Sequence, residues 1–163
     1  MSERETSISG RGLHMAVVVS RYNDFVTARL RAGAVEALAA CGVADEDVTI
    51  LEVPGSFEIP MAARRAAETG RFDAVVCLGC LIRGETAHFE YIAAAASQGL
   101  MTAATDTGVP MTFGILTTDS AEQALARAGS GPTNKGWESA VAAVEMARMF
   151  RDLAARPPER SQA

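Results

Sequence analysis

Short apolar runs alternate with helical patterns along almost the whole chain, and this alternation limits the possible folds more than any other feature. The runs at 15–20, 48–53, 72–82 and 111–117 are rich in Val, Ile and Leu and contain few polar residues. Continuous runs of this kind are typical of strands that are buried on both faces. Helical spacing between them predicts a parallel sheet with helices on both faces, an α/β sandwich of three layers.

Helices are expected between and after these runs, at about 24–41, 56–70, 86–108, 120–128 and 135–153. Side chains that can form N-caps stand near their starts, and the candidates are Asn23 or Asp24, Ser56, Thr86, and Asp119 or Ser120. Gly99 lies inside the third helix, whose apolar face keeps its phase on both sides of this residue. We therefore interpret Gly99 as an interior glycine that costs about 1 kcal/mol, rather than as a helix end.

The 163 residues fit one globular domain, since 48% are apolar and 21% are charged. We expect a flexible segment at 1–11, one folded domain at 12–154 and a disordered tail at 155–163, where two prolines follow the last helix. The net charge of -5 argues against nucleic acid or an anionic membrane as the main partner. No apolar run reaches the roughly 18 residues of a membrane helix, and the polar first ten residues do not resemble a secretory signal. We expect a cytoplasmic protein.

The cysteines do not predict a redox or metal site. Cys77 and Cys80 have the spacing of a redox pair, but they lie within an apolar run that predicts a strand. Residues three apart in a strand point to opposite faces and are about 10 Å apart, beyond the ~7 Å that a disulfide can bridge. The two histidines offer no zinc-ligand spacing around the pair. We interpret both cysteines as buried structural thiols.

Polar and aromatic residues follow the end of each expected strand. These segments are 21–24, 54–58, 83–88 and 117–119, and the third holds His88, one of two histidines in the chain. In open α/β sheets, ligands bind outside the carboxyl ends of the strands. The sequence therefore predicts a ligand site where these four segments meet.

Each group in these segments also has a plainer structural interpretation. Residues 83–86 join a strand to a helix through a glycine and suit an anion, but they also fit an ordinary capped turn. His88 in the first helical turn is a candidate proton shuttle or simply a hydrogen-bonded side chain. Glu58 could hold the hydroxyl groups of a sugar-like ligand or complement a helix dipole, and Tyr22 could stack on a flat heterocycle or pack.

Residues 129–135 imitate a phosphate-binding P-loop without fulfilling its pattern. Asn134 replaces the second glycine, Gly136 replaces the Ser or Thr, and the segment joins two expected helices instead of following a strand. We therefore reject a nucleoside triphosphate site. Lys135 is either a solvated surface residue or an anion ligand.

Taken together, these segments resemble the lumazine synthase family over about residues 12–150. The matching motifs are Arg21-Tyr-Asn-Asp-Phe25, Val53-Pro-Gly-Ser-Phe-Glu-Ile-Pro60, Leu78-Gly-Cys-Leu-Ile-Arg-Gly-Glu-Thr-Ala-His88, Thr107-Gly-Val-Pro110 with Phe113-Gly114, and Ala128-Gly129 with Asn134-Lys-Gly136. The resemblance implies a flavodoxin-like fold with a four-stranded parallel sheet. It also implies a condensation, without cofactor or metal, of 5-amino-6-(D-ribitylamino)uracil with 3,4-dihydroxy-2-butanone 4-phosphate.

The resemblance further implies roles for individual residues. It gives proton transfer to His88, which would be the catalytic residue. The pyrimidine and ribityl groups would contact Tyr22, Ser56, Phe57, Glu58, Leu81 and Ile82, together with Phe113 from a neighbouring subunit. The phosphate would contact Gly84, Glu85, Thr86 and Arg127, with Lys135 close to it.

Family members form rings of five subunits, and in some of them twelve rings form a shell of sixty. The resemblance therefore implies a pentamer. The corner at 129–133 has the length found in shell-forming members but departs from them at Gly131, so a decamer or a 60-mer stays open. Riboflavin synthase is a candidate partner. Two alternatives remain: a catalytically weak paralogue that binds lumazine or riboflavin or forms a shell, and a flavodoxin or receiver domain.

Overall fold

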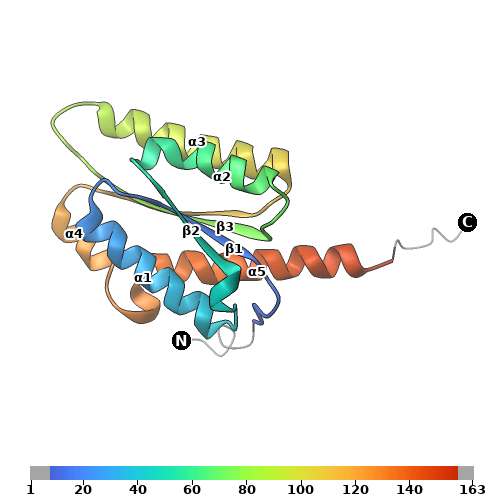
Figure 1. Cartoon of the computed structure of the whole chain (residues 1–163). Coiled ribbons are helices and arrows are strands. Elements are labelled where there is room, and N and C mark those ends of the chain that lie inside the picture. Colours follow the sequence, from blue (N-terminus) through green and yellow to red (C-terminus); the bar gives the residue numbers. More distant parts are fainter. Residues whose placement is uncertain (1–7, 158–163) are drawn as a thin grey trace, which may run out of the picture.

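The computed structural model describes residues 8–157, which contain one parallel sheet with the strand order β2-β1-β3-β4 (Figure 1). The strands are β1 (Met15–Ser20), β2 (Val48–Val53), β3 (Ala74–Ile82) and β4 (Met111–Thr118). The two central strands, β1 and β3, are buried almost throughout, whereas the edge strands β2 and β4 are partly exposed. The predicted parallel sheet is confirmed.

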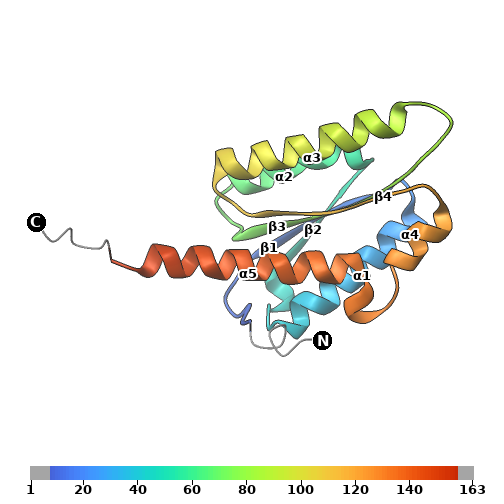
Figure 2. The ribbon, with the colours of Figure 1, turned by 180° about the vertical axis from the view of Figure 1, so that it is seen from behind.

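Helices cover both faces of this sheet. Those in the described residues are α1 (Asp24–Ala40), α2 (Ile59–Glu68), α3 (His88–Thr107), α4 (Ala121–Arg127) and α5 (Lys135–Ala155). Figures 1 and 2 show α2 and α3 together on one face and α1, α4 and α5 on the other. The three-layer α/β sandwich expected from the sequence is therefore confirmed.

Alternate residues of the central strands feed two separate hydrophobic cores. Cys77 belongs to the core beneath α2 and α3, and Cys80 belongs to the core beneath α1 and α5. Both are buried free thiols on opposite faces of β3, as predicted. Burial raises the pKa of the Cys80 thiol to about 11 and raises that of Cys77 even more, so both stay protonated at neutral pH.

The caps predicted at Ser56 and Thr86 are wrong, because both side chains are engaged elsewhere. Ser56 is buried in a 3-10 turn at Ser56–Glu58, and a Cβ at Gly79 would lie 2.6 Å from its Oγ, so it packs against β3 instead of capping α2. Thr86 accepts a hydrogen bond from the backbone N–H of His88, two residues further on (3.4 Å). This closes a local turn, and α3 begins at His88.

Gly99 lies in the interior of α3, as predicted, and the structure gives it a packing role. A Cβ at this position would lie 2.9 Å from Cβ of Pro60 in α2. The glycine therefore lets α2 and α3 approach each other closely. Gly136 has the same role at a tighter contact, because a Cβ there would lie 2.0 Å from the carbonyl oxygen of Leu30 in α1.

The segment before β1 is attached to the end of α5. The Arg148 guanidinium donates to the carbonyl oxygens of Ser9 and Arg11 (2.9 Å each), and the Gly10 N–H donates to the Cys41 carbonyl (2.7 Å). The predicted segment 1–11 and tail 155–163 extend into 1–7 and 158–163, which lie outside the described residues, so these boundaries stay predictions. Within 8–157, no helix is long and apolar enough to cross a membrane.

Substituting the two glycines should destabilise the protein to different degrees. Gly136→Ala places a methyl group against backbone, so α1 and α5 must separate, and we expect a loss of about 3 kcal/mol in the free energy of unfolding. Gly99→Ala meets a side-chain carbon and should cost about 1 kcal/mol. Urea unfolding at fixed protein concentration measures both, with Glu145→Ala on the surface of α5 as a control. Equal stability of the Gly136 variant and the control would contradict the close α1–α5 contact.

Candidate active site

A cavity of about 760 Å³ opens at the carboxyl ends of β1, β2 and β3, where three of the four predicted segments meet; the fourth, 117–119, does not line it. Its walls come from the residues after β1, the turn after β2, the end of β3 and the first turns of α3. Many of the residues singled out in the sequence lie here: Tyr22, Ser56, Phe57, Glu58, Leu81, Ile82, Gly84, Thr86 and His88. The size and mixed lining are typical of a site for small molecules.

Three other predicted residues lie around a second cavity of about 610 Å³. Phe113 comes from the edge strand β4, Arg127 from the end of α4 and Lys135 from the start of α5. Figure 2 shows β4 at the edge of the sheet with α4 beside it. The two cavities have no lining residue in common. Glu85 lines neither of them and lies exposed in the loop between β3 and α3.

The first cavity has a buried floor and exposed aromatic walls. Ser56 and Leu81 are almost fully buried, whereas Tyr22 and Phe57 are 71% and 63% exposed. Large aromatic side chains gain free energy when another surface covers their faces. Tyr22 and Phe57 are thus free to stack on a flat ligand without any rearrangement of the core.

Backbone contacts between neighbouring segments fix the mouth of this cavity. The Arg21 and Tyr22 N–H groups donate to the carbonyls of Val53 and Pro54 (2.8 and 3.0 Å), which extends the pairing of β1 with β2 beyond the strands. Asn23 has a left-handed backbone (φ 61°), and its Nδ2 donates to the Cys80 carbonyl (2.9 Å). Asn23 therefore ties the end of β1 to β3 and, although it occupies the N-cap position of α1, does not cap the helix with its side chain.

The loop 84–87 presents features of an anion site. Within the part of the chain that the structure describes, the N–H groups of Gly84, Glu85 and Thr86 have no hydrogen-bond partner. The 20-residue helix α3 follows directly, and its dipole is positive at this end. Free N–H groups at a helix start, with His88 as the first helical residue, favour a bound phosphate next to an imidazole.

The cations near the two cavities differ in what they already bind. Arg83 is engaged with Asp119 and Glu90. Lys135 Nζ lies 2.6 Å from Oε2 of Glu138. Arg127 is exposed, and its side chain has no ion pair or hydrogen bond among residues 8–157, so its guanidinium is available to a ligand. No group of three potential ligands that could hold a metal ion occurs among those same residues.

Asn134 fixes the start of α5, which carries Lys135 into the second cavity, and this role was not predicted from the sequence. Its Oδ1 accepts from the N–H groups of Gly136 and Trp137 (2.7 and 3.3 Å), which makes it the N-cap of α5. Its Nδ2 donates to the carbonyls of Arg29 and Gly129 (3.0 and 2.7 Å). Asn before a helical pattern is a known cap signal, but nothing in the sequence indicates the contact with α1.

The lining of the first cavity also includes residues to which no individual role was assigned from the sequence. Asn23, Pro54 and Gly55 lie in the predicted segments 21–24 and 54–58, whereas Phe89, Tyr91 and Ile92 lie outside the predicted segments. Phe89, Tyr91 and Ile92 follow His88 in the first turns of α3, and helical spacing from His88 would have pointed to Tyr91 and Ile92. The fold and these cavities define an α/β protein with a small-molecule site at the carboxyl ends of a parallel sheet.

Comparison with known proteins identifies the family. The family model for 6,7-dimethyl-8-ribityllumazine synthase matches residues 12–151. The 6,7-dimethyl-8-ribityllumazine synthase of Desulfosudis oleivorans (strain DSM 6200 / JCM 39069 / Hxd3) is 50% identical over 146 residues, covering 90% of this chain and 93% of that protein. The one of Syntrophus aciditrophicus (strain SB) is 46% identical over 149 residues, covering 91% and 97%.

The chain therefore belongs to the 6,7-dimethyl-8-ribityllumazine synthase family, transferases of riboflavin biosynthesis. The resemblance inferred from the motifs is confirmed, and so is the flavodoxin-like α/β fold. The alternative of a flavodoxin or receiver domain is wrong, because the family match covers nearly the whole chain.

Replacing Asn134 should disturb the corner that carries Lys135. Asn134→Ala loses four hydrogen bonds of a buried side chain and should lower the free energy of unfolding by about 3 kcal/mol. Asn134→Asp keeps the acceptor but places a carboxylate against two carbonyls, which raises the pKa of the new acid in the folded state. The Asp variant should therefore gain stability relative to wild type as the pH falls from 7 to 5. Urea unfolding at both pH values measures this, and a pH-independent difference would contradict it.

Proposed function

We propose that this chain condenses 5-amino-6-(D-ribitylamino)uracil with 3,4-dihydroxy-2-butanone 4-phosphate, forming 6,7-dimethyl-8-ribityllumazine with release of phosphate and water. The observation that carries this proposal is the first cavity, where exposed aromatic rings, one carboxylate and one histidine face a loop with free backbone N–H groups. The aromatic rings can stack on a flat heterocycle, the carboxylate can accept hydrogen bonds from its polyol chain, and the free N–H groups can bind a phosphate ester. The two named relatives carry the name of the product.

The residues of the first cavity divide between the two substrates. We assign the pyrimidine ring to Tyr22, Leu81 and Ile82, whose apolar surfaces suit a flat ring. We assign the ribityl hydroxyls to the turn that contains Ser56, Phe57 and Glu58. The butanone phosphate would bind at Gly84, Glu85 and Thr86, through backbone N–H groups at the start of α3.

The chemistry requires proximity and proton transfer more than a nucleophile. An amine attacks a ketone, phosphate leaves and a second ring closes, so both substrates must be held together while protons move. Correct placement can supply much of the acceleration, and a histidine adds about 10²- to 10⁴-fold. His88 lines the cavity beside the loop and is our candidate for these proton transfers.

We further propose that each active site forms between two subunits of a pentamer. Phe113, Arg127 and Lys135 line a different cavity from the other assigned residues, and a neighbouring copy could bring its second cavity against the first. The outer face of α3 supports close contact between copies. Its exposed residues between Glu90 and Asp106 carry no charge: Tyr91, Ala94, Ala95, Ser97, Gln98, Met101, Thr102 and Thr105.

Larger assemblies and cellular context extend the same proposal. The sedimentation coefficient, measured by analytical ultracentrifugation, would distinguish a pentamer from a decamer and from a 60-mer. The 60-mer would be an icosahedral capsid. The cytoplasm is the location we propose. Riboflavin synthase, which uses the lumazine, is the proposed partner that receives the product.

The decisive experiment mixes the purified protein with both substrates and follows the visible absorbance of the lumazine, with the uncatalysed rate subtracted. A rate proportional to protein concentration supports the proposal. A rate equal to background, from protein that still sediments as a pentamer or larger, would contradict it and favour a binding or shell-forming paralogue.

Arg127→Ala should raise KM for the butanone phosphate about tenfold, since one unpaired cation would be lost from a phosphate. KM for the pyrimidine should change less than about twofold. Arg65→Ala is a matched control, because that arginine is 82% exposed on α2 and lines neither cavity. Equal increases in both KM values would remove Arg127 from the phosphate role.

Mixed oligomers test whether the site spans two subunits. His88→Ala and Phe113→Ser subunits are each expected to have low activity, because each variant lacks one side of every site. After joint unfolding and refolding in equal amounts, about a quarter of the contacts between neighbours would combine an intact first cavity with an intact Phe113. We expect about that fraction of wild-type activity. No recovery, from oligomers that have reassembled, would place the site within one chain.

A further inference from the structure

Arg83 connects three elements around the loop 84–87 without lining either cavity. Its backbone N–H donates to the Thr118 carbonyl at the end of β4 (2.8 Å), and its Nε lies 2.9 Å from Oδ1 of Asp119. A second nitrogen, Nη1, donates to Oε1 of Glu90 in the first turn of α3. The guanidinium carbon also lies 4.6 Å from the centre of the Phe89 ring.

These contacts leave Arg83 unsuited to bind a phosphate itself. Hydrogen bonds to Asp119 and then to Glu90 raise the pKa of the guanidinium, and two carboxylates balance its charge. One face of the group lies over the Phe89 ring, a favourable cation–π geometry. Its side chain therefore serves to hold neighbouring segments together.

Arg83 directly precedes the loop 84–87, and two of its partners, Phe89 and Glu90, follow that loop. The loop itself has little internal bonding: Thr86 bonds only to the His88 N–H, and Gly84 has no atom within 4 Å of where a Cβ would be. A side chain that joins Arg83 to Phe89 and Glu90 closes this segment on itself. The contact with Asp119 fixes the closed segment to the turn between β4 and α4.

We propose that Arg83 is a positioning residue of the reaction, whose side chain clasps the two ends of the loop 84–87 and so holds the loop N–H groups and His88 in a fixed relative position. This inference rests on the proposed function, in which the loop binds the phosphate and His88 moves protons. Phe89 lines the first cavity, so the stacking contact also braces the wall next to His88.

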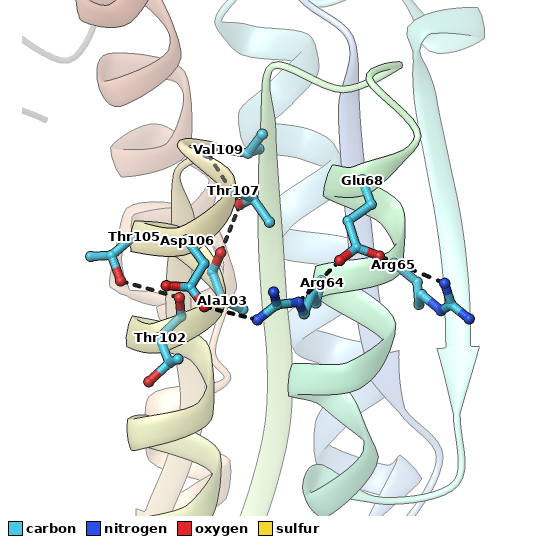
Figure 3. A network of polar contacts seen from close by, with 9 residues as sticks. All are labelled: Arg64, Arg65, Glu68, Thr102, Ala103, Thr105, Asp106, Thr107 and Val109. Atoms are coloured by element: carbon cyan, nitrogen blue, oxygen red, sulfur yellow. Dashed lines mark hydrogen bonds and ion pairs between the residues drawn. The ribbon is translucent and has the colours of Figure 1, made fainter.

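Arg64 provides a matched control, because it contacts the C-terminal end of α3, whereas Arg83 contacts the N-terminal end of α3. Arg64 of α2 donates to Glu68 and to Asp106 of α3, both at 3.0 Å, as Figure 3 shows. Its side chain is 43% exposed, close to the 48% of Arg83. Both arginines therefore bridge two carboxylates and hold one end of α3, but Arg64 lines neither cavity.

The test compares Arg83→Gln with Arg64→Gln in the assembled enzyme. We expect Arg83→Gln to raise KM for the butanone phosphate about tenfold and to lower kcat, while KM for the pyrimidine changes less than about twofold. Arg64→Gln should leave all three values within about twofold. Arg83→Lys, which keeps the charge but can make only part of the network, should fall between Arg83→Gln and wild type. Equal kinetic values for the two Gln variants would overturn the proposal.

The variant Glu90→Gln separates a clasp from a simple charge effect. If the network only tuned the local charge, removing a carboxylate near the phosphate would lower KM for the butanone phosphate. A clasp loses one attachment instead, so we expect this KM to rise about fourfold. An unchanged or lower KM would overturn the proposal.

Hydrogen exchange gives a readout that does not depend on activity. The amides of His88 and Tyr91, which donate to Thr86 Oγ and to the Ala87 carbonyl, should exchange faster in Arg83→Gln than in wild type, while Arg64→Gln should leave them unchanged. Unchanged exchange of both amides in Arg83→Gln would overturn the proposal. Failure of the proposed function is a separate outcome, since it would appear as a wild-type protein with no catalysed rate.

Discussion

Backbone hydrogen bonding between parallel strands is the constraint on which the candidate site depends. Because all four strands run in the same direction, their carboxyl ends meet at one end of the sheet. The bonding continues past the strands, from Arg21 to Val53 and from Arg83 to Thr118. Residues from Tyr22 to Ile92, which are up to about 70 positions apart in sequence, thereby line one cavity.

The cationic side chains around this end of the sheet differ in how many carboxylates they already bind. This difference distinguishes cations that can bind a ligand from those that hold the protein's own segments in position. Arg127 carries an unpaired guanidinium in the described part of the chain, and Lys135 is paired once, with Glu138. Arg83 is paired twice. A cation that already balances two carboxylates adds little to anion binding, whereas an unpaired cation can contribute a full charge-assisted hydrogen bond. For this reason we propose Arg127, rather than the arginine that directly precedes the loop 84–87, as the phosphate ligand.

Periodicity was enough to predict the sheet, the helices and the interior position of Gly99, because these depend on patterns within one segment. The caps at Ser56 and Thr86 were predicted wrongly, because Ser56 packs against β3 and Thr86 bonds within its own turn. Asn134 and Gly136 were missed as packing residues because their partners, Arg29 and Leu30, lie about a hundred positions away. Most roles in the site came from family motifs, since residue type alone left alternatives for Tyr22, Glu58 and His88.

The separation of the assigned residues into two cavities has a physical consequence for how such a site could be regulated or lost. Both cavities are built on the same stiff sheet, so Phe113 on β4 and His88 after β3 keep a fixed spacing within one chain. In the pentamer that we propose, a second copy would bring them to one ligand. In that arrangement a substitution in the contact between copies changes catalysis without touching any substrate, and dissociation removes activity while each chain stays folded.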